Sequence, residues 1–102
     1  MTIFLYGSGQ YELRRNIAQM MAAYAQKNGS DMGIERIEGA TVKYDQLAAA
    51  LAAVPFLASS RLVIIDDLLT NKAVAERMAS LLELIPKTTV AVFAEREVDG
   101  RT

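Results

Sequence analysis

Two adjacent acidic residues follow the most apolar stretch of the chain. The run 62–65, Leu-Val-Ile-Ile, leads directly into Asp66 and Asp67. A continuously apolar run of this kind is typical of a strand covered on both faces of a parallel sheet. Ligands gather at the carboxyl ends of such strands, and paired carboxylates there can hold Mg²⁺ together with substrate phosphates. The pair thus resembles the metal-side strand of a nucleotide hydrolase. A solvated strand end, with Asp67 aiding a turn, also explains it, and we favour that interpretation.

A glycine turn near the N-terminus lies where a phosphate-binding loop would be expected. The segment Gly7-Ser8-Gly9 can place an anion at a helix N-terminus. Counted from Gly7 against G-x-x-x-x-G-K-[ST], however, the second glycine position holds Glu12, the lysine position Leu13 and the hydroxyl position Arg14. Leu13 cannot neutralise phosphate charge, and Glu12 repels it. A dinucleotide-binding G-x-G-x-x-G would also need glycine at position 12. We therefore interpret the segment as a strand-to-helix turn that only needs glycine geometry.

Together these features indicate the frame of a nucleotide hydrolase from which the ATP chemistry has been lost. The degenerate nucleotide site, which we expect to be inactive, comprises Gly7, Ser8, Gly9, Asp66 and Asp67. The alternative is a small Mg-nucleotide-binding enzyme or switch domain that uses the same residues. A generic doubly wound domain whose function resides in other parts of a longer protein is a third alternative.

Composition excludes several kinds of catalytic site. The 102 residues contain neither cysteine nor histidine, so disulfides, thiolate or imidazole metal sites and Ser-His or Cys-His nucleophile pairs are all ruled out. We expect no catalytic residue, no bound metal and no cofactor. The 52% hydrophobic and 23% charged residues fit one packed domain, or part of one.

Charge and hydropathy limit the possible partners. The net charge of −1 gives no overall attraction to nucleic acid, and we expect Arg14, Arg15 and Lys27 to form the solvated face of the first helix. No apolar run reaches the roughly 18 residues of a membrane span, and the N-terminus lacks a basic leader. We therefore expect no membrane association and a cytoplasmic protein.

A short apolar connector precedes the acidic strand. Pro55, Phe56 and Leu57 are followed by the small residues 58–60, Ala-Ser-Ser. Both large side chains can pack into the core, which is the simpler interpretation. Two neighbouring side chains on a short connector rarely both point inward, however, and proline stiffens the turn. A rigid, exposed aromatic-aliphatic pair loses little entropy on docking and suits a protein-binding anchor.

The elements that position these residues alternate along the chain. Apolar runs bounded by turn residues predict strands over about 3–6, 34–37, 62–65 and 89–94. Helices are predicted over about 10–28, from a cap at Thr41 or its neighbour to Pro55, and over 71–85. Asn28 and Gly29 form the stop signal of the first helix. This β-α-β-α-β-α-β pattern indicates a three-layer α/β fold with a parallel sheet and helices on both faces.

Each predicted helix has one apolar face. The first face comprises Leu13, Ile17, Met20, Met21 and Tyr24. The second comprises Leu47, Ala50, Leu51 and Val54. The third comprises Val74, Met78, Leu81, Leu82 and Ile85. The tail 95–102 is polar and contains no closing element, so we expect the chain to be either truncated or the opening segment of a larger fold.

Three stretches together resemble the N-terminal domain of the bacterial DNA polymerase III delta subunit family. They are Phe-Leu-Tyr-Gly at 4–7, Pro-Phe-Leu-Ala-Ser-Ser-Arg-Leu-Val-Ile-Ile at 55–65, and Leu-Ile-Pro-Lys-Thr-Thr-Val-Ala-Val-Phe at 84–93. The most specific part is the P-F-L-x-x-x-R-L-V spacing. The resemblance covers nearly the whole chain, so residues 1–102 would be the N-terminal part of the first domain, with the later domains absent.

The resemblance implies a P-loop NTPase (AAA+)-like fold with a degenerate phosphate loop and no ATP hydrolysis. It implies a non-catalytic clamp-loader subunit of the DNA polymerase III holoenzyme that binds the sliding clamp and helps open it during DNA replication. In the family an adjacent pair of large apolar side chains before the third strand grips the clamp. Phe56 and Leu57 match that position here, with Pro55 as their stiffener. The acidic pair Asp66-Asp67 departs from many family members.

Partners and topology follow from the same resemblance. The family implies contact with the sliding clamp (beta subunit), contact with other clamp-loader subunits through the full-length chain, and only an indirect relation to DNA. The implied strand order is second, third, fourth, first. The strand over 3–6 would then form one edge of the sheet, and an unprotected edge tends to pair with another copy of the chain.

Overall fold

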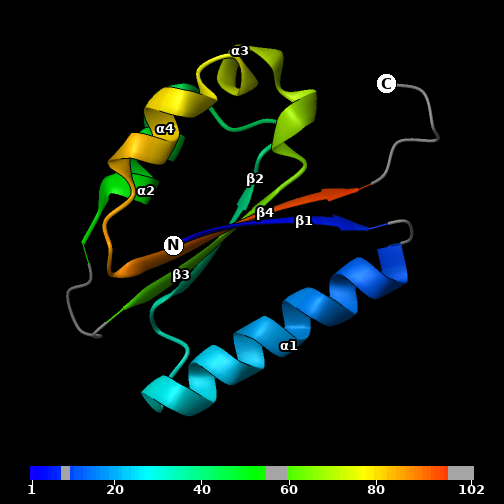
Figure 1. The fold of residues 1–102 in the computed structure, drawn as a ribbon, viewed down its shortest axis with the longest axis vertical. Helices are drawn as coiled ribbons and strands as arrows, with labels where there is room; N and C mark the ends of the chain where they lie inside the picture. The colour runs from blue at the N-terminus through cyan, green and yellow to red at the C-terminus, as the bar shows by residue number, and fades with distance from the viewer. Residues whose placement is uncertain (8–9, 55–59, 97–102) are drawn as a thin grey trace.

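The computed structural model describes residues 1–7, 10–54 and 60–96 and shows one parallel sheet between two layers of helices (Figure 1). The strands are β1 (Thr2–Gly7), β2 (Ile34–Glu38), β3 (Arg61–Asp66) and β4 (Thr89–Arg96), and their order in the sheet is β1-β4-β3-β2. All three strand pairs are parallel. The predicted strands and the predicted strand order are therefore confirmed.

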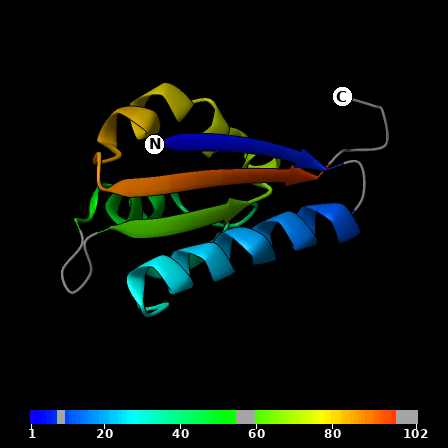
Figure 2. The ribbon, with the colours of Figure 1, turned by 60° about the horizontal axis from the view of Figure 1, so that its bottom comes forward.

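One long helix covers one face of the sheet. Helix α1 (Gln10–Asn28) ends before Gly29, as the stop signal predicted. Leu13 and Ile17 of α1 are buried against side chains of β3 and β4, while the rest of its predicted face packs around them. Of the helices that the structure describes, Figure 2 shows only α1 on this side of the sheet. These residues form the first core, together with Leu62, Ile64, Val92 and Ala94.

Three shorter helices and one turn of 3₁₀ helix cover the opposite face. They are α2 (Tyr44–Ala52), η1 (Leu68–Thr70), α3 (Lys72–Ala75) and α4 (Met78–Leu84). Their buried side chains meet the other face of β3 and β4 in the second core, which comprises Leu47, Leu51, Val63, Ile65, Leu68, Val74, Leu81, Ala91 and Phe93. Both faces of β3 are thus covered, which explains its continuously apolar sequence.

The prediction of one continuous third helix is wrong. A continuous helix over 71–85 was expected, but the chain forms α3 and α4 with an interruption at Glu76 and Arg77. The Arg77 backbone leaves helical geometry (φ −111°, ψ 23°), and its guanidinium lies 3.5 Å from the centre of the Tyr44 ring. The predicted apolar face survives the break, because Val74 and Leu81 are buried in the same core.

The ends of the second predicted helix also differ. Helix α2 is capped at Lys43 rather than at Thr41 or its neighbour, and the Gln46 side chain accepts a hydrogen bond from the Lys43 N–H at 3.4 Å. At its other end Ala53 is already extended, and Val54, which was predicted to face the core, is 69% exposed. The helix therefore stops before the position at which Pro55 would have ended it.

Candidate functional site

The connector between α2 and β3 has described residues on both sides. The predicted anchor residues Pro55, Phe56 and Leu57 lie outside the described residues. Val54, which precedes them, is exposed, and Ser60, which follows them, is partly buried. The geometry of the site therefore rests on how these two ends are held.

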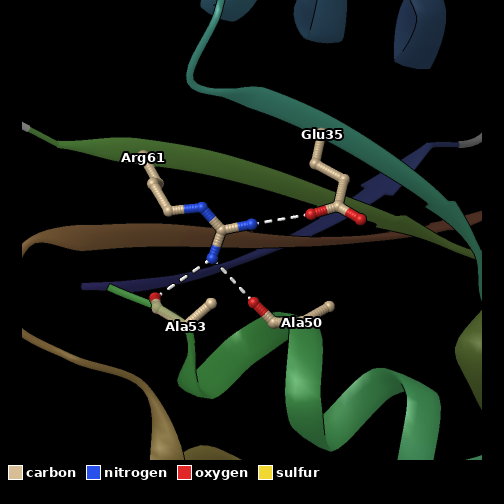
Figure 3. Close-up of polar contacts among 4 residues, drawn as sticks. All are labelled: Glu35, Ala50, Ala53 and Arg61. Atoms are coloured by element: carbon tan, nitrogen blue, oxygen red, sulfur yellow. Dashed lines mark hydrogen bonds and ion pairs between the residues drawn. The ribbon is translucent and has the colours of Figure 1, made fainter. Parts of the chain in front are cut away.

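The Arg61 side chain holds the α2 end. Figure 3 shows its guanidinium donating to the carbonyl oxygens of Ala50 and Ala53, at 2.7 and 3.1 Å, and to the Glu35 carboxylate at 2.6 Å. A cation at a helix C-terminus satisfies carbonyls that have no partner within the helix and complements the helix dipole. The Arg61 side chain is only 14% exposed, so these bonds are partly shielded from water. Arg61, the first residue of β3, thus joins this strand to α2 and to β2.

One side-chain contact and two backbone contacts hold the β3 end. The Tyr24 hydroxyl of α1 donates to the Ser60 carbonyl at 2.6 Å. The Arg61 N–H donates to the Thr88 carbonyl at 3.0 Å, and the Leu62 N–H to the Gly33 carbonyl at 2.9 Å. The connector therefore enters and leaves through residues that are tied to both helical layers and to both neighbouring strands.

From the sequence, Arg61 was identified only as part of a motif, and Tyr24 only as part of the apolar face of the first helix. Neither polar contact is visible in a pattern of apolar spacing, because each joins residues far apart in the chain. The only signal in the sequence that could have indicated the Arg61 contacts is the ability of arginine to donate to several acceptors at once.

The structure shows why leucine stands in the lysine position that follows the glycine turn. Gly7, the last residue of β1, is buried, while Ser8 and Gly9 lie outside the described residues. Leu13, in the lysine position, is 6% exposed and packs in the first core, whereas Glu12 is exposed in the first turn of α1. Leu13 therefore contributes to packing and presents no charge to a phosphate.

The acidic pair is held by contacts within the protein. Arg36 of β2 donates to both Asp66 carboxylate oxygens, at 2.7 and 3.2 Å, and the Asp66 carboxylate raises the pKa of Arg36. Asp67 has a left-handed backbone (φ 57°) at the start of η1, a conformation that aspartate tolerates better than most residues. In the part of the chain that the structure describes, no three acidic side chains are arranged to hold a metal ion.

Glu95 is a third carboxylate at this end of the sheet, and the sequence analysis missed it. It was assigned to the polar tail, but it lies within β4 and is 4% exposed. Its two oxygens accept hydrogen bonds from the N–H groups of Leu68 and Leu69, at 3.0 and 3.2 Å. Burial raises the pKa of Glu95, the two N–H donors lower it, and the nearby charges of Asp67 and Asp66 raise it further.

Gly39 allows β2 to end against the start of η1. Its N–H donates to the Asp66 carbonyl at 2.7 Å, and a Cβ atom at this position would lie 2.6 Å from that oxygen and 2.8 Å from the Leu68 Cα. Only glycine fits so close an approach. The carboxyl ends of β2, β3 and β4 are thus occupied by protein contacts: Gly39 on Asp66, Arg36 on Asp66 and Glu95 on η1.

The comparison with protein families decides the identity of the domain. The family model described as "DNA polymerase III, delta subunit" matches residues 4–101. The chain belongs to the DNA polymerase III delta subunit family. The predicted membership, and with it the α/β fold class of a clamp-loader delta protein, is confirmed.

A solved structure supports the same fold for this delta-family chain. The Bacillus subtilis DNA clamp loader delta protein YqeN superimposes with a TM-score of 0.72 at 20% sequence identity. The match covers 99% of this chain and 33% of YqeN, so the chain spans about a third of that protein's length. No curated protein matches the sequence. No helix within the described residues is both long and apolar enough to cross a membrane.

Proposed function

We propose that this delta-family chain is the N-terminal part of a non-catalytic clamp-loader subunit that binds the sliding clamp and helps open it during DNA replication. Pro55, Phe56 and Leu57 form the clamp-binding anchor in this proposal. Contacts with other clamp-loader subunits involve other parts of a longer chain. Family membership supports the role, and the observation that carries the site is the way both ends of the connector are fixed.

Fixed ends reduce the entropy that an anchor loses when it docks. Arg61 holds the carbonyl groups of Ala50 and Ala53 before the anchor, and Tyr24 holds the carbonyl of Ser60 after it. Only the five residues 55–59 lie between Val54 and Ser60. Held residues on both sides of so short a segment support a low entropic cost of docking.

Opening follows from a difference in affinity. A ligand shifts an equilibrium between two states only by as much as its binding free energy differs between them. The anchor therefore favours the open ring if it binds the open form of the clamp more tightly than the closed form. No nucleotide chemistry in this segment is required for that step.

The test is truncation of the anchor to alanine. We expect Phe56→Ala and Leu57→Ala to weaken binding to the clamp by about 2 kcal/mol or more each, as for a buried hot spot, measured by titration calorimetry. Leu84→Ala is the matched control, because Leu84 is an exposed leucine on α4 and is not part of the connector. Unchanged affinity in both anchor variants, with native clamp binding intact, would remove these residues from the proposal.

The same calorimeter tests the Mg-nucleotide alternative. Leu13 in the lysine position is buried, and Asp66 is already paired with Arg36. We therefore expect no heat of binding from Mg-ATP or Mg-GTP. Submillimolar binding of either would support the alternative enzyme or switch domain.

A further inference from the structure

The exposed side of α1 forms a basic hollow together with β2. Tyr11, Arg14, Arg15 and Ala18 are spaced i, i+3, i+4 and i+7, so they share one helical face. With Arg36 of β2 they line a shallow, open hollow of about 460 Å³. We refer to these five residues as the basic hollow. Its volume lies within the range of about 300–1,000 Å³ that small ligands and short segments of larger ones occupy.

The side chains of the basic hollow combine an aromatic ring with fixed positive charge. Tyr11 is 75% exposed, and the Arg15 guanidinium lies 5.9 Å from the centre of its ring. Guanidinium groups stay protonated at any physiological pH and match phosphate oxygens in geometry. Arg36 is held in place by its two hydrogen bonds to Asp66, whose carboxylate offsets its charge, so it forms a fixed wall while Arg14 and Arg15 carry the positive charge of the hollow. The acidic Glu12 projects from a different face of α1, about 100° around the helix from Tyr11.

We propose that the basic hollow binds single-stranded nucleic acid directly. Arg14 and Arg15 contact backbone phosphates, and a base stacks on the Tyr11 ring. An exposed aromatic side chain within a positively charged groove is the combination by which proteins hold single strands without reading their sequence. An acidic peptide would use the arginines but would have no base to place on the ring. The inference goes beyond the indirect relation to DNA expected from the sequence.

Fluorescence anisotropy with a labelled oligo(dT) of about 20 nucleotides, longer than one such site, tests the proposal at about 50 mM salt, where phosphate contacts are strong. The double variant Arg14→Gln/Arg15→Gln is expected to bind about tenfold more weakly. The slope of log K against log salt should become shallower by about 1.4, since each phosphate contact contributes about 0.7 for single strands. Tyr11→Ala is expected to weaken binding about fivefold or more, with a smaller effect on a duplex of the same length.

The matched control is Lys27→Gln/Lys72→Gln, which removes the same number of charges from exposed positions outside the basic hollow. This control should retain native affinity and the native salt slope. Equal losses in both double variants would overturn the proposal, because the binding would then depend only on overall charge. Absence of binding by the native chain would also overturn it. If a polyglutamate peptide binds as tightly as oligo(dT) and Tyr11→Ala has no effect, the hollow is instead a docking surface for an acidic protein.

Discussion

At the scale of single residues, Arg61 determines how the connector begins. Its guanidinium serves two helix carbonyls and one carboxylate. We expect Arg61→Met, which keeps the apolar stem, to lower the free energy of unfolding by about 1.5–3 kcal/mol, because the charged donor to two helix carbonyls, one of them partly buried, is lost. Urea denaturation measures this loss. If the proposed anchor binds the clamp, the same variant should also weaken clamp binding, because the α2 end of the connector is released.

The variant Glu35→Gln tests the contribution of the ion pair separately from that of the helix cap. The Glu35 side chain is half exposed, so its pair with Arg61 is worth less than about 1 kcal/mol. Glu35→Gln should therefore be much milder than Arg61→Met. Equal effects of the two substitutions would show that the ion pair matters and the cap does not.

Glu95 gives the fold a dependence on pH. Because the pKa of Glu95 is raised in the folded state from its ordinary value of 4.5, the folded chain holds this proton more tightly than the unfolded chain. The resulting stabilisation is fully present below pH 4.5 and is lost as the pH rises through the folded-state pKa. Asp66, Asp67 and the N–H groups of Leu68 and Leu69 are the groups whose fields act on it.

The measurement is urea denaturation at several pH values, comparing the native chain with Glu95→Gln. We expect the stability of the native chain relative to the variant to fall as the pH rises above 4.5. Glu83→Gln, at an exposed position of α4, is the control for loss of a carboxylate. A difference between native chain and Glu95→Gln that stays constant or grows with pH would contradict the assigned shift.

At the scale of elements, Gly39 fixes the junction of β2, β3 and η1. Gly39→Ala places a methyl group against the backbone of Asp66 and Leu68. We expect a loss of about 1–3 kcal/mol in unfolding free energy from this overpacking. Gly29→Ala is the comparison, since its surroundings are open and only its left-handed backbone (φ 70°) opposes a side chain, at about 1 kcal/mol. Equal thermal shifts for the two variants would show that the close approach is not tight.

The elements themselves were largely predictable from apolar spacing. The buried run at β3 and the stripe on α1 report burial directly, and both are present as expected. The interruption at Arg77 was not predictable, because the Tyr44 ring that its guanidinium covers lies more than 30 positions away. The exposed Val54 was missed for a similar reason: the helix end is set by Arg61, beyond the connector.

The polar contacts of the site were the least predictable part. Asp66 was expected at a solvated strand end or a metal site, but Arg36 on the neighbouring strand pairs with it. Glu95 was assigned to the polar tail because a charged residue is usually exposed. Here two N–H donors offset the cost of burying its carboxylate. Sequence spacing reports which residues share a face, but it does not report which charges meet across strands.

At the scale of the whole molecule, the edge of the sheet formed by β1 is less covered than its centre. Strand β1 lies at one end of the sheet, and its side chains alternate between the faces. Phe4 stacks on Phe93 with ring centres 5.1 Å apart, yet it is 46% exposed, and Tyr6 is 69% exposed. Within the described residues no strand pairs with the outer edge of β1. This edge and these rings offer apolar surface for further packing.

The ladder on both sides of β3 has a mechanical consequence. If the anchor grips a ring that resists opening, the tension passes from Ser60 into Arg61, the first residue of β3. That strand shares parallel hydrogen-bond ladders with β2 on one side and β4 on the other. A load along the strand is thus divided among many bonds at once, and at the other end of the connector the bonds of Arg61 to Ala50 and Ala53 share it with α2. Pulling along β3 would have to break these hydrogen bonds together rather than one after another.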